Sequence, residues 1–304
     1  MEPVTTNPRF AEAYQKLADV RLNPRRHTAA NALAHSEMVA RRAGALARAN
    51  GCTPDEVQLL ENLGRAHDIG KITGTAKPEK SLGVLADCGV SDPAFLALVK
   101  WHDTNLPWWT SSQRGQPPTD KAWRRLASEL DVRLLVLFMV ADRVDAPPGW
   151  RRNAPLVWFL GEAKQRALVG DLDLDLPGEP SEISAGGVLV HDGKALVIRV
   201  RADHFELPKG GIEWDELPPD AAMRETREEA GVTGALEAEG ELGHVDYRVA
   251  THDKRVRYFK LRGEGVLGPL PSRTHERRWV TRDELASLPF VTEDVRTLAL
   301  RAFS

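Results

Sequence analysis

One stretch of the sequence decides the fold of the second half of the chain: Gly210-Gly-Ile-Glu-Trp-Asp-Glu216, followed after seven residues by Arg224-Glu-Thr-Arg-Glu-Glu-Ala-Gly-Val232. The pattern predicts a helix over residues 219–229 that stops at Gly231. Gly210 and Gly211 let the preceding loop pass close to phosphates or to the helix itself. The stretch therefore predicts a glycine-containing loop that leads into an acidic helix.

The predicted helix carries three glutamates on one face, because Glu225, Glu228 and Glu229 stand at i, i+3 and i+4. Carboxylates this close repel one another unless a divalent cation or an arginine neutralises them. Their hard oxygen atoms suit Mg²⁺ or Mn²⁺. A solvated face with salt bridges to Arg224 and Arg227 would explain the same three residues. The three glutamates alone therefore do not distinguish a metal site from a solvated helix face, whereas the spacing of the whole stretch does.

The two halves of the chain differ in periodicity. Residues 29–49, 54–67 and 131–144 predict helices, so the first half is expected to be all-α. After about residue 182, strands are expected at 183–190, 194–200, 241–249, 255–262 and 277–280, with a closing helix from about Glu293. The second half is therefore predicted to mix helices and strands.

A segment between the halves, residues 171–182, ends in proline, glycine and acid and predicts a linker. Its alternating Asp and Leu would also suit a short edge strand. The expected organisation is a first domain over residues 1–170, this linker, and a second domain over residues 183–304.

The composition excludes several classes of protein. The chain has 304 residues, enough for two domains, and two cysteines, which rule out a disulfide framework and favour the cytoplasm. No apolar run reaches the roughly 20 residues of a membrane span. The net charge of −3 gives no reason to expect sequence-specific DNA binding. It combines 23 Lys+Arg against 18 Asp+Glu in residues 1–170 with 18 against 26 in residues 171–304.

Four side chains in the first half form a candidate metal site: His35, the pair His67-Asp68, and Asp142. An ionised Asp142 inside an apolar helix needs a partner, because burying it unpaired is costly. A metal would be that partner, and a mixed N/O ligand set suits Mn, Fe, Ni, Co or Zn. Taken singly, His35 is more often an ordinary histidine, and Asp142 would also be satisfied by Arg143.

Taken together, these residues resemble the HD-domain phosphohydrolases, whose pattern is His, then His-Asp, then Asp, and the resemblance spans about residues 26–167. It implies a catalytic metal bound by His35, His67, Asp68 and Asp142. Such a metal polarises a phosphate and lowers the pKa of bound water, which Asp68 would help to orient. His102 falls where many family members place a second-metal or phosphate-contacting histidine.

Other residues near this pattern bear on the substrate. Lys71, in His67-Asp-Ile-Gly-Lys71, would either reach a phosphate as a point charge or stay solvated. Trp101, Trp108 and Trp109 surround His102 in the sequence and would either stack a nucleobase or pack in the core. The polar segment 110–120 is a candidate lid or a long surface loop.

The spacing of the second stretch (Gly, five residues, Glu, seven residues, then Arg-Glu-x-x-Glu-Glu-x-Gly-Val) is identified as the Nudix box, and the resemblance spans about residues 183–304. It departs from the family pattern at Thr226, where an aliphatic residue is preferred. Nudix enzymes hydrolyse a nucleoside diphosphate linked to another group. The resemblance implies an α-β-α sandwich with a mixed sheet, and Mg or Mn bound by Glu225, Glu228 and Glu229.

The same resemblance implies supporting roles around these ligands. Glu216 would pair with Arg224 or act as a further ligand, and Gly210 and Gly211 shape the loop. The general base would be Glu229 or Glu276. Lys209 would contact a phosphate, since Glu206-Leu-Pro-Lys-Gly210 looks like the lead-in of members that cleave diadenosine polyphosphates.

The sequence thus predicts a bifunctional hydrolase that contains an all-α HD domain and an α/β Nudix domain. The first would hydrolyse phosphoesters of nucleotides or RNA ends, and the second a pyrophosphate, with a diadenosine-polyphosphate-like substrate favoured. An RNA-end processing factor and a nucleotide-sensing regulator with one inactive domain are the alternatives. ADP-ribose, a nucleoside triphosphate or a capped RNA 5′ end also fits the second domain. The sequence leaves the oligomeric state open.

Overall fold

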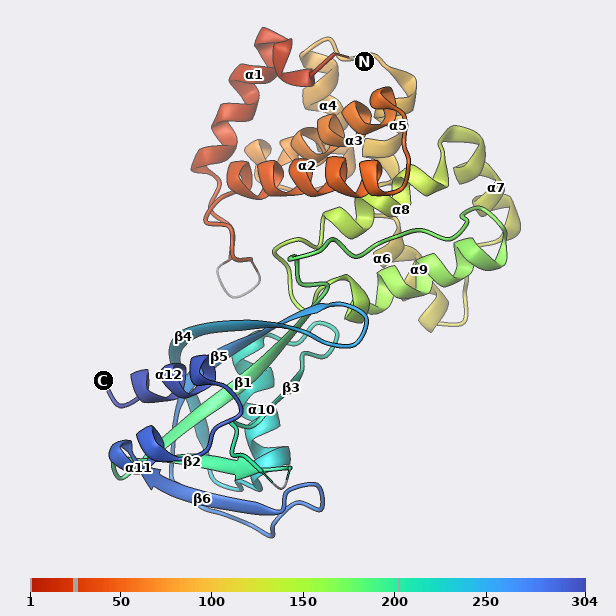
Figure 1. Cartoon of the computed structure of the whole chain (residues 1–304). Coiled ribbons are helices and arrows are strands. Elements are labelled where there is room, and N and C mark those ends of the chain that lie inside the picture. Colours follow the sequence, from red (N-terminus) through yellow and green to blue (C-terminus); the bar gives the residue numbers. More distant parts are fainter. Residues whose placement is uncertain (1, 24–26, 202) are drawn as a thin grey trace. The chain divides into compact units, whose positions relative to one another are not determined.

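The computed structural model describes residues 2–23, 27–201 and 203–304, so residue 26, where the HD resemblance begins, lies outside the described residues. The chain forms two compact units, Met1–Ser181 and Glu182–Ser304 (Figure 1). Residues 171–181 lie with the first unit, where Leu174 is buried and the Asp173 N–H donates to Asn50 Oδ1 at 2.8 Å. The domain limits 1–170, 171–182 and 183–304 stay a prediction.

The described part of the first unit is all-α, as the sequence predicted. Its helices are α1 (Pro8–Gln15), α2 (Ala32–Ala49), α3 (Pro54–Ala66), α4 (Pro78–Asp87), α5 (Pro93–Trp101), α6 (Asn105–Gln113), α7 (Asp120–Glu129), α8 (Val132–Ala141) and α9 (Ala154–Gln165). Local signals start several of them. The Thr53 side chain and Glu56 form a capping box at α3, and Asn31 caps α2. The segment 110–120, predicted as a loop, instead begins with the last turn of α6.

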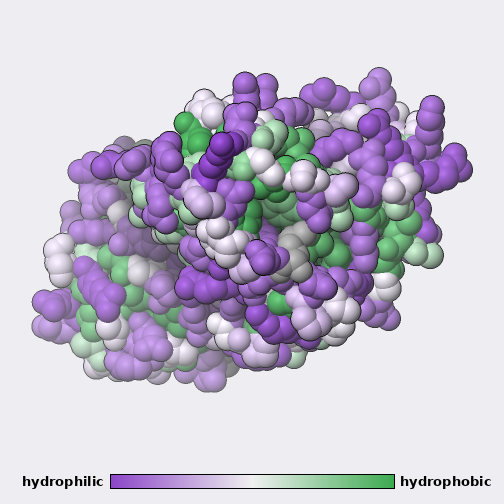
Figure 2. Space-filling model, turned by 90° about the horizontal axis from the view of Figure 1, so that it is seen from above, coloured by the Kyte–Doolittle hydropathy of each residue, from purple (hydrophilic) through white to green (hydrophobic). Residues whose placement is uncertain are grey.

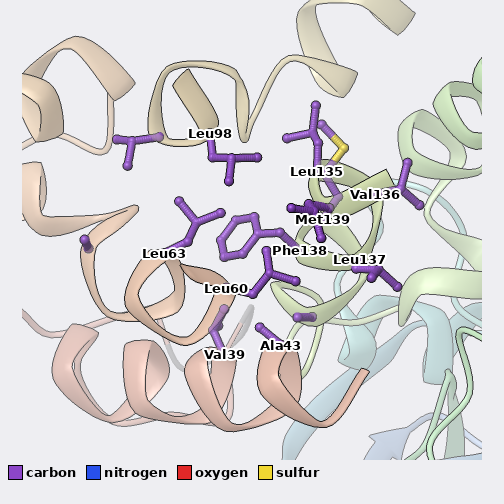
Figure 3. Close-up of a cluster of buried hydrophobic side chains, with 14 of the residues drawn as sticks. Val39, Ala43, Leu60, Leu63, Leu98, Leu135, Val136, Leu137, Phe138 and Met139 are labelled. Atoms are coloured by element: carbon purple, nitrogen blue, oxygen red, sulfur yellow. The ribbon is translucent and has the colours of Figure 1, made fainter. Parts of the chain in front are cut away.

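The core of the first unit surrounds α8, in which every residue except Arg133 is buried. Phe138 lies among Leu60, Leu63 and Leu98 of the neighbouring helices (Figure 3). Helices α2 and α3 pack so closely that a Cβ added at Gly64 would lie 2.4 Å from Ala40 Cα. This tight packing fixes the ends of α2, α3 and α8 relative to one another, and the candidate metal ligands lie at those ends.

The second unit is built on a mixed sheet with strand order β4-β5-β1-β2-β6, and β3 pairs with β1. The strands are β1 (Glu182–His191), β2 (Lys194–Arg199), β3 (Lys209–Gly211), β4 (Leu236–Arg248), β5 (Asp253–Gly263) and β6 (Glu276–Thr281). β1 and β5 are parallel, whereas the other pairs are antiparallel.

Helices cover both faces of this sheet. Adjacent residues of β1 point to opposite sides: Leu189 packs in a core with Ala222 of α10 (Pro218–Ala230), and Val188 in a core with Leu298 of α12 (Glu293–Arg301). The short helix α11 (Arg282–Ser287), which the sequence did not predict, adds Leu285 to the second of these cores. The predicted α-β-α sandwich with a mixed sheet is confirmed.

The surface shown in Figure 2 is mostly hydrophilic, with hydrophobic residues in separate patches. Five large hydrophobic side chains in the described residues are exposed, namely Leu106, Val157, Tyr247, Val266 and Leu270. Among the helices that the structure describes, none combines the length and apolar character needed to cross a membrane.

Candidate functional sites

The four side chains predicted to bind a metal in the first unit lie at helix ends. His67 ends α3 and Asp68 follows it, while His35 lies in the first turn of α2. Asp142 ends α8, whereas the sequence predicted that it lies inside this helix. The prediction was wrong because the apolar run contains no signal that marks the end of the helix. All four are buried, with exposures of 1–8%.

These side chains converge on one point. Asp142 Oδ1 lies 3.2 Å from His35 Nε2 and 3.3 Å from His67 Nε2. His67 Nε2 is also 3.3 Å from Asp68 Oδ2. Ligand atoms about 2.0–2.2 Å from one ion are themselves about 3 Å apart. The spacing therefore suits a single cation, and His35, His67 and Asp68 form a group of atoms within 4.8 Å of one another.

His67 lies at the centre of this group, and one of its ring nitrogens is available to bind a metal. His67 Nδ1 donates to the Gly64 carbonyl at 3.0 Å, which leaves Nε2 as the lone-pair nitrogen of the neutral ring. His67 Nε2 is buried and has no hydrogen-bond partner among the described residues. It points at carboxylates, which repel a lone pair unless a cation lies between. The residues present therefore fit a divalent metal.

The pKa shifts of His67, Asp68 and Asp142 also indicate that these carboxylates require a nearby positive charge. Burial alone would lower the pKa of His67, but the Asp68 and Asp142 carboxylates raise it to about 10. Although burial disfavours both carboxylates, His67 and Lys71 hold the pKa of Asp68 well below its usual range, and Arg143 does so for Asp142. In the metal-free protein, protons supply the positive charge that the carboxylates require.

The other predicted residues of this site lie around it. Lys71 Nζ is 2.6 Å from Asp68 Oδ2 and is mostly buried, so it is not a solvated lysine. The ring of His102 lies 5.3 Å from that of His67, and its Nδ1 donates to the Val99 carbonyl at 2.7 Å. Arg143 pairs with Asp142, which is the partner that the sequence offered for Asp142 as the alternative to a metal. The structure therefore places Asp142 against both histidines and an arginine.

Sequence reasoning missed two residues beside this cluster. Asp145 Oδ1 lies 3.0 Å from His35 Nδ1 and 3.3 Å from His27 Nδ1. The sequence offers one signal for Asp145: it follows Asp142 by three residues, a spacing that would place both side chains on one face if the helix continued.

The tryptophans favour the packing alternative. Trp108 packs edge-on against Trp123 at 4.8 Å and tilted against Phe159 at 6.1 Å. The Trp101 indole N–H donates to Glu129 Oε2 at 2.7 Å. Trp108 of α6 thus packs against rings of α7 and α9, and Trp101 of α5 contacts Trp108 and Glu129.

In the second unit, Arg224 organises the acidic helix. Its guanidinium makes a forked contact with Glu216 at 2.9 and 2.8 Å, as predicted from the sequence, and donates to the Gly211 carbonyl at 2.8 Å. Its Nη1 also lies 2.7 Å from Glu225 Oε1 and 3.2 Å from Glu228 Oε2. The hydrogen bonds to Glu216 and Glu225 raise the pKa of Arg224.

The loop before the helix lies against the remaining carboxylates. A Cβ added at Gly210 would lie 2.2 Å from the Glu225 carboxylate, so the backbone must pass this close. The Lys209 N–H donates to Glu229 Oε2 at 2.8 Å, and its ammonium pairs with the buried Glu206 at 2.5 Å. Burial raises the pKa of Glu229. Glu206 was not a predicted site residue, and its place in the lead-in to the box was its only signal.

Two further residues of this half have clear contacts. The Glu276 carboxylate, at the start of β6, pairs with Arg199 at 2.7 Å and with Arg278 at 2.8 Å. Thr226 is buried, and its hydroxyl donates to the Ala222 carbonyl at 2.7 Å, so the departure from the box is satisfied within the helix. Among the described residues, the helix glutamates do not form a metal-sized group like that of the first unit. Their carboxylate oxygens are nevertheless the donors that Mg²⁺ and Mn²⁺ prefer.

The described residues thus form an all-α unit in which histidines and carboxylates converge, and a sandwich that carries an acidic helix. The comparisons identify the families. Residues 32–146 match the model of the HD domain, and residues 180–300 match that of the NUDIX domain. The chain therefore carries an HD domain followed by a NUDIX domain, and both families depend on divalent metal ions.

Curated relatives match part of the chain. It is 42% identical to Nudix hydrolase 4 of Arabidopsis thaliana over 93 residues, which are 29% of this chain and 44% of that protein. It is 39% identical to an 8-oxo-(d)GTP phosphatase of Mycolicibacterium smegmatis, over 23% of this chain and 21% of the relative. It is 35% identical to a MutT-like protein of Streptomyces ambofaciens, over 34% of this chain and 66% of the relative. The chain spans less than half the length of Nudix hydrolase 4.

Proposed function

We propose that this protein is a bifunctional metal-dependent phosphohydrolase. The first unit hydrolyses phosphomonoesters or phosphodiesters of nucleotides or RNA ends, and the second hydrolyses the pyrophosphate of a nucleoside diphosphate linked to another group. The observation that carries the proposal is the buried His67 Nε2, which has no hydrogen-bond partner among the described residues and faces two carboxylates.

In the first unit, the metal is held by His35, His67, Asp68 and Asp142, with His102 beside them. A bound Mn, Fe, Ni, Co or Zn ion would supply Lewis acidity and a water of lowered pKa. Asp68 orients that water. Lys71, held 2.6 Å from Asp68, contributes a positive charge beside the phosphate. Lys71 and Arg143 are each paired with a proposed ligand carboxylate, and once a metal neutralised Asp68 and Asp142 they would add positive charge that suits an anionic substrate.

In the second unit, Glu225, Glu228 and Glu229 hold Mg or Mn, which would neutralise the pyrophosphate charge. Glu216 holds Arg224, and Arg224 in turn restrains Glu225 and the loop at Gly211. Of the two candidate general bases, Glu229 is favoured, because its pKa is raised by burial, whereas Glu276 is paired with two arginines.

The proposed substrate of the second unit is a diadenosine-polyphosphate-like molecule, with Lys209 as its phosphate contact. A nucleoside triphosphate is the second candidate, since one relative is an 8-oxo-(d)GTP phosphatase. We further propose that the protein acts in the cytoplasm, and that its partners are nucleotides or RNA ends and not membranes. RNA-end processing and nucleotide sensing remain the alternative roles.

The test is a metal-by-substrate screen of the full chain. Substrates are mononucleotides, 3′-phosphate and 2′,3′-cyclic RNA ends, diadenosine polyphosphates, nucleoside triphosphates and ADP-ribose, each with Mg²⁺, Mn²⁺, Co²⁺ and Ni²⁺. Asp142→Asn should abolish phosphoester hydrolysis alone, and Glu228→Gln should reduce pyrophosphate hydrolysis alone. Tight nucleotide binding without turnover under every condition would refute the enzyme and favour the sensor.

A further inference from the structure

Behind the proposed ligands of the first unit lies a carboxylate that the proposed function does not use. Asp145 Oδ1 is 3.0 Å from His35 Nδ1 and 3.3 Å from His27 Nδ1. Asp145 Oδ2 accepts the Ala29 N–H at 3.2 Å. Asp145 and His35 are each 2% exposed. Each oxygen of this carboxylate thus faces nitrogen donors of the chain, and the imidazole of His35 stands between Asp145 and Asp142.

The position of each histidine in its helix explains why His35 needs a carboxylate. The last carbonyls of a helix have no intrahelical partner. His67 and His102 end their helices, and the Gly64 and Val99 carbonyls accept their Nδ1–H groups. His35 lies in the first turn of α2, where the free backbone groups are N–H donors. An acceptor for its Nδ1–H must come from elsewhere in the chain.

We infer that Asp145 is the positioning residue that holds His35 with Nε2 turned toward Asp142 and His67. The inference rests on the proposed metal-dependent function of this unit. A carboxylate behind a metal-binding histidine fixes the proton on the far nitrogen, fixes the ring orientation and makes the near nitrogen a stronger ligand. Asp145 does for His35 what a helix carbonyl does for His67.

His27 supports the same arrangement from the outer side. Its ring packs edge-on against His35 with centroids 5.3 Å apart, and its side chain is 24% exposed. His27, His35 and Asp145 also have ligand-capable atoms within 4.8 Å of one another. A metal at that position would have to replace the proton on His35 Nδ1 and compete with the Ala29 N–H for Asp145. The contacts therefore favour positioning over a separate metal site.

The experiment compares full-length wild-type protein with Asp145→Ala and Asp145→Asn. Calorimetric titration of the metal-free proteins with Mn²⁺ gives affinity and stoichiometry. Long-range ¹H–¹⁵N NMR of the same metal-free proteins, at a pH high enough for the His35 ring to be neutral, reports its tautomer. Asp145→Ala should weaken Mn²⁺ binding about 10- to 100-fold and lose the Nδ1–H form of His35. Asp145→Asn retains an acceptor, so its loss should be smaller.

Asp175→Ala is the matched control, because Asp175 is a carboxylate of the same unit that is paired with Arg151. It should keep the wild-type affinity. Unchanged affinity and an unchanged His35 tautomer in Asp145→Ala would overturn the positioning role. Loss of one whole metal equivalent in His27→Ala would overturn it in favour of a second metal site. Wild-type protein that binds no metal would refute the proposed function, while the tautomer of metal-free Asp145→Ala would still decide the role of Asp145.

Discussion

Gly64 is the residue where the packing of the first unit limits the geometry of its candidate metal site. A Cβ added there would lie 2.4 Å from Ala40 Cα and 2.5 Å from Ala40 N, both in the backbone of α2. Non-bonded carbons make contact at about 3.5–4.0 Å. Because a helix backbone cannot move aside like a flexible side chain, Gly64→Ala should separate α2 from α3 by about 1 Å.

That separation acts directly on two proposed ligands. His35 belongs to α2 and His67 ends α3, and their rings lie 5.6 Å apart. A shift of about 1 Å exceeds the tolerance of about 0.2 Å on metal–ligand distances. Misplacement of this size costs about 10²-fold in activity, and overpacking costs about 1–3 kcal/mol of stability. We expect Gly64→Ala to fold, to bind the metal more weakly, and to lose about 10²-fold in phosphoester hydrolysis.

Calorimetric metal titration, thermal unfolding and the two hydrolase assays would measure these effects. Gly83→Ala in α4 is the matched control, because nothing lies within 4 Å of a Cβ there. Alanine is the better helix former by about 1 kcal/mol, so this control should be as stable as the wild type or slightly more stable. The pyrophosphatase activity should be unchanged in both variants. Wild-type metal affinity and Tm in Gly64→Ala would refute the reasoning.

Three further predictions concern the two sites. Gly210→Ala puts a Cβ 2.2 Å from the Glu225 carboxylate, so pyrophosphate hydrolysis should fall about 10²-fold with phosphoester hydrolysis retained, and a fully active variant would show that the loop does not constrain Glu225. In metal-free protein, the pKa of His67 is raised from 6.5 to about 10, so its stabilisation is complete below pH 6.5 and is lost as the pH rises through 10. The Tm of EDTA-treated protein should therefore fall across this range, and an equal fall in His67→Gln would contradict the assignment. Arg224→Lys loses the forked contact with Glu216, so denaturant unfolding of the second unit should show a loss of about 1–2 kcal/mol, and no loss would mean that one ammonium satisfies Glu216.

Local signals made much of the fold and part of each site predictable. The Thr53 and Glu56 capping box, with Pro54 between them, starts α3, so the start of this helix follows from residues within one segment. The Arg224–Glu216 pair was predictable because eight residues of loop and helix separate the two. The family patterns in both halves rest on spacing of the same local kind, and both were confirmed by the family matches.

Contacts between distant segments were beyond prediction. Asp145 contacts His35 although 110 residues separate them in the sequence, and no pattern near either residue predicts the contact. The end of α8 at Asp142 was misplaced because an apolar run shows how much helix is buried and not where it stops. The burial of Glu206 beside Lys209 depends likewise on how the loop folds onto α10, which the spacing of the box does not encode.

The length of chain between partners in the first site has a consequence for folding kinetics. His35 and Asp142 are 107 residues apart, so their contact closes most of the chain of the unit. Contacts of such long range slow folding, because the entropy of closing the loop is lost before the contact forms. Interactions that form after the folding transition state act on the unfolding rate. A cation bound at this point would therefore prolong the lifetime of the folded unit while leaving its folding rate nearly unchanged.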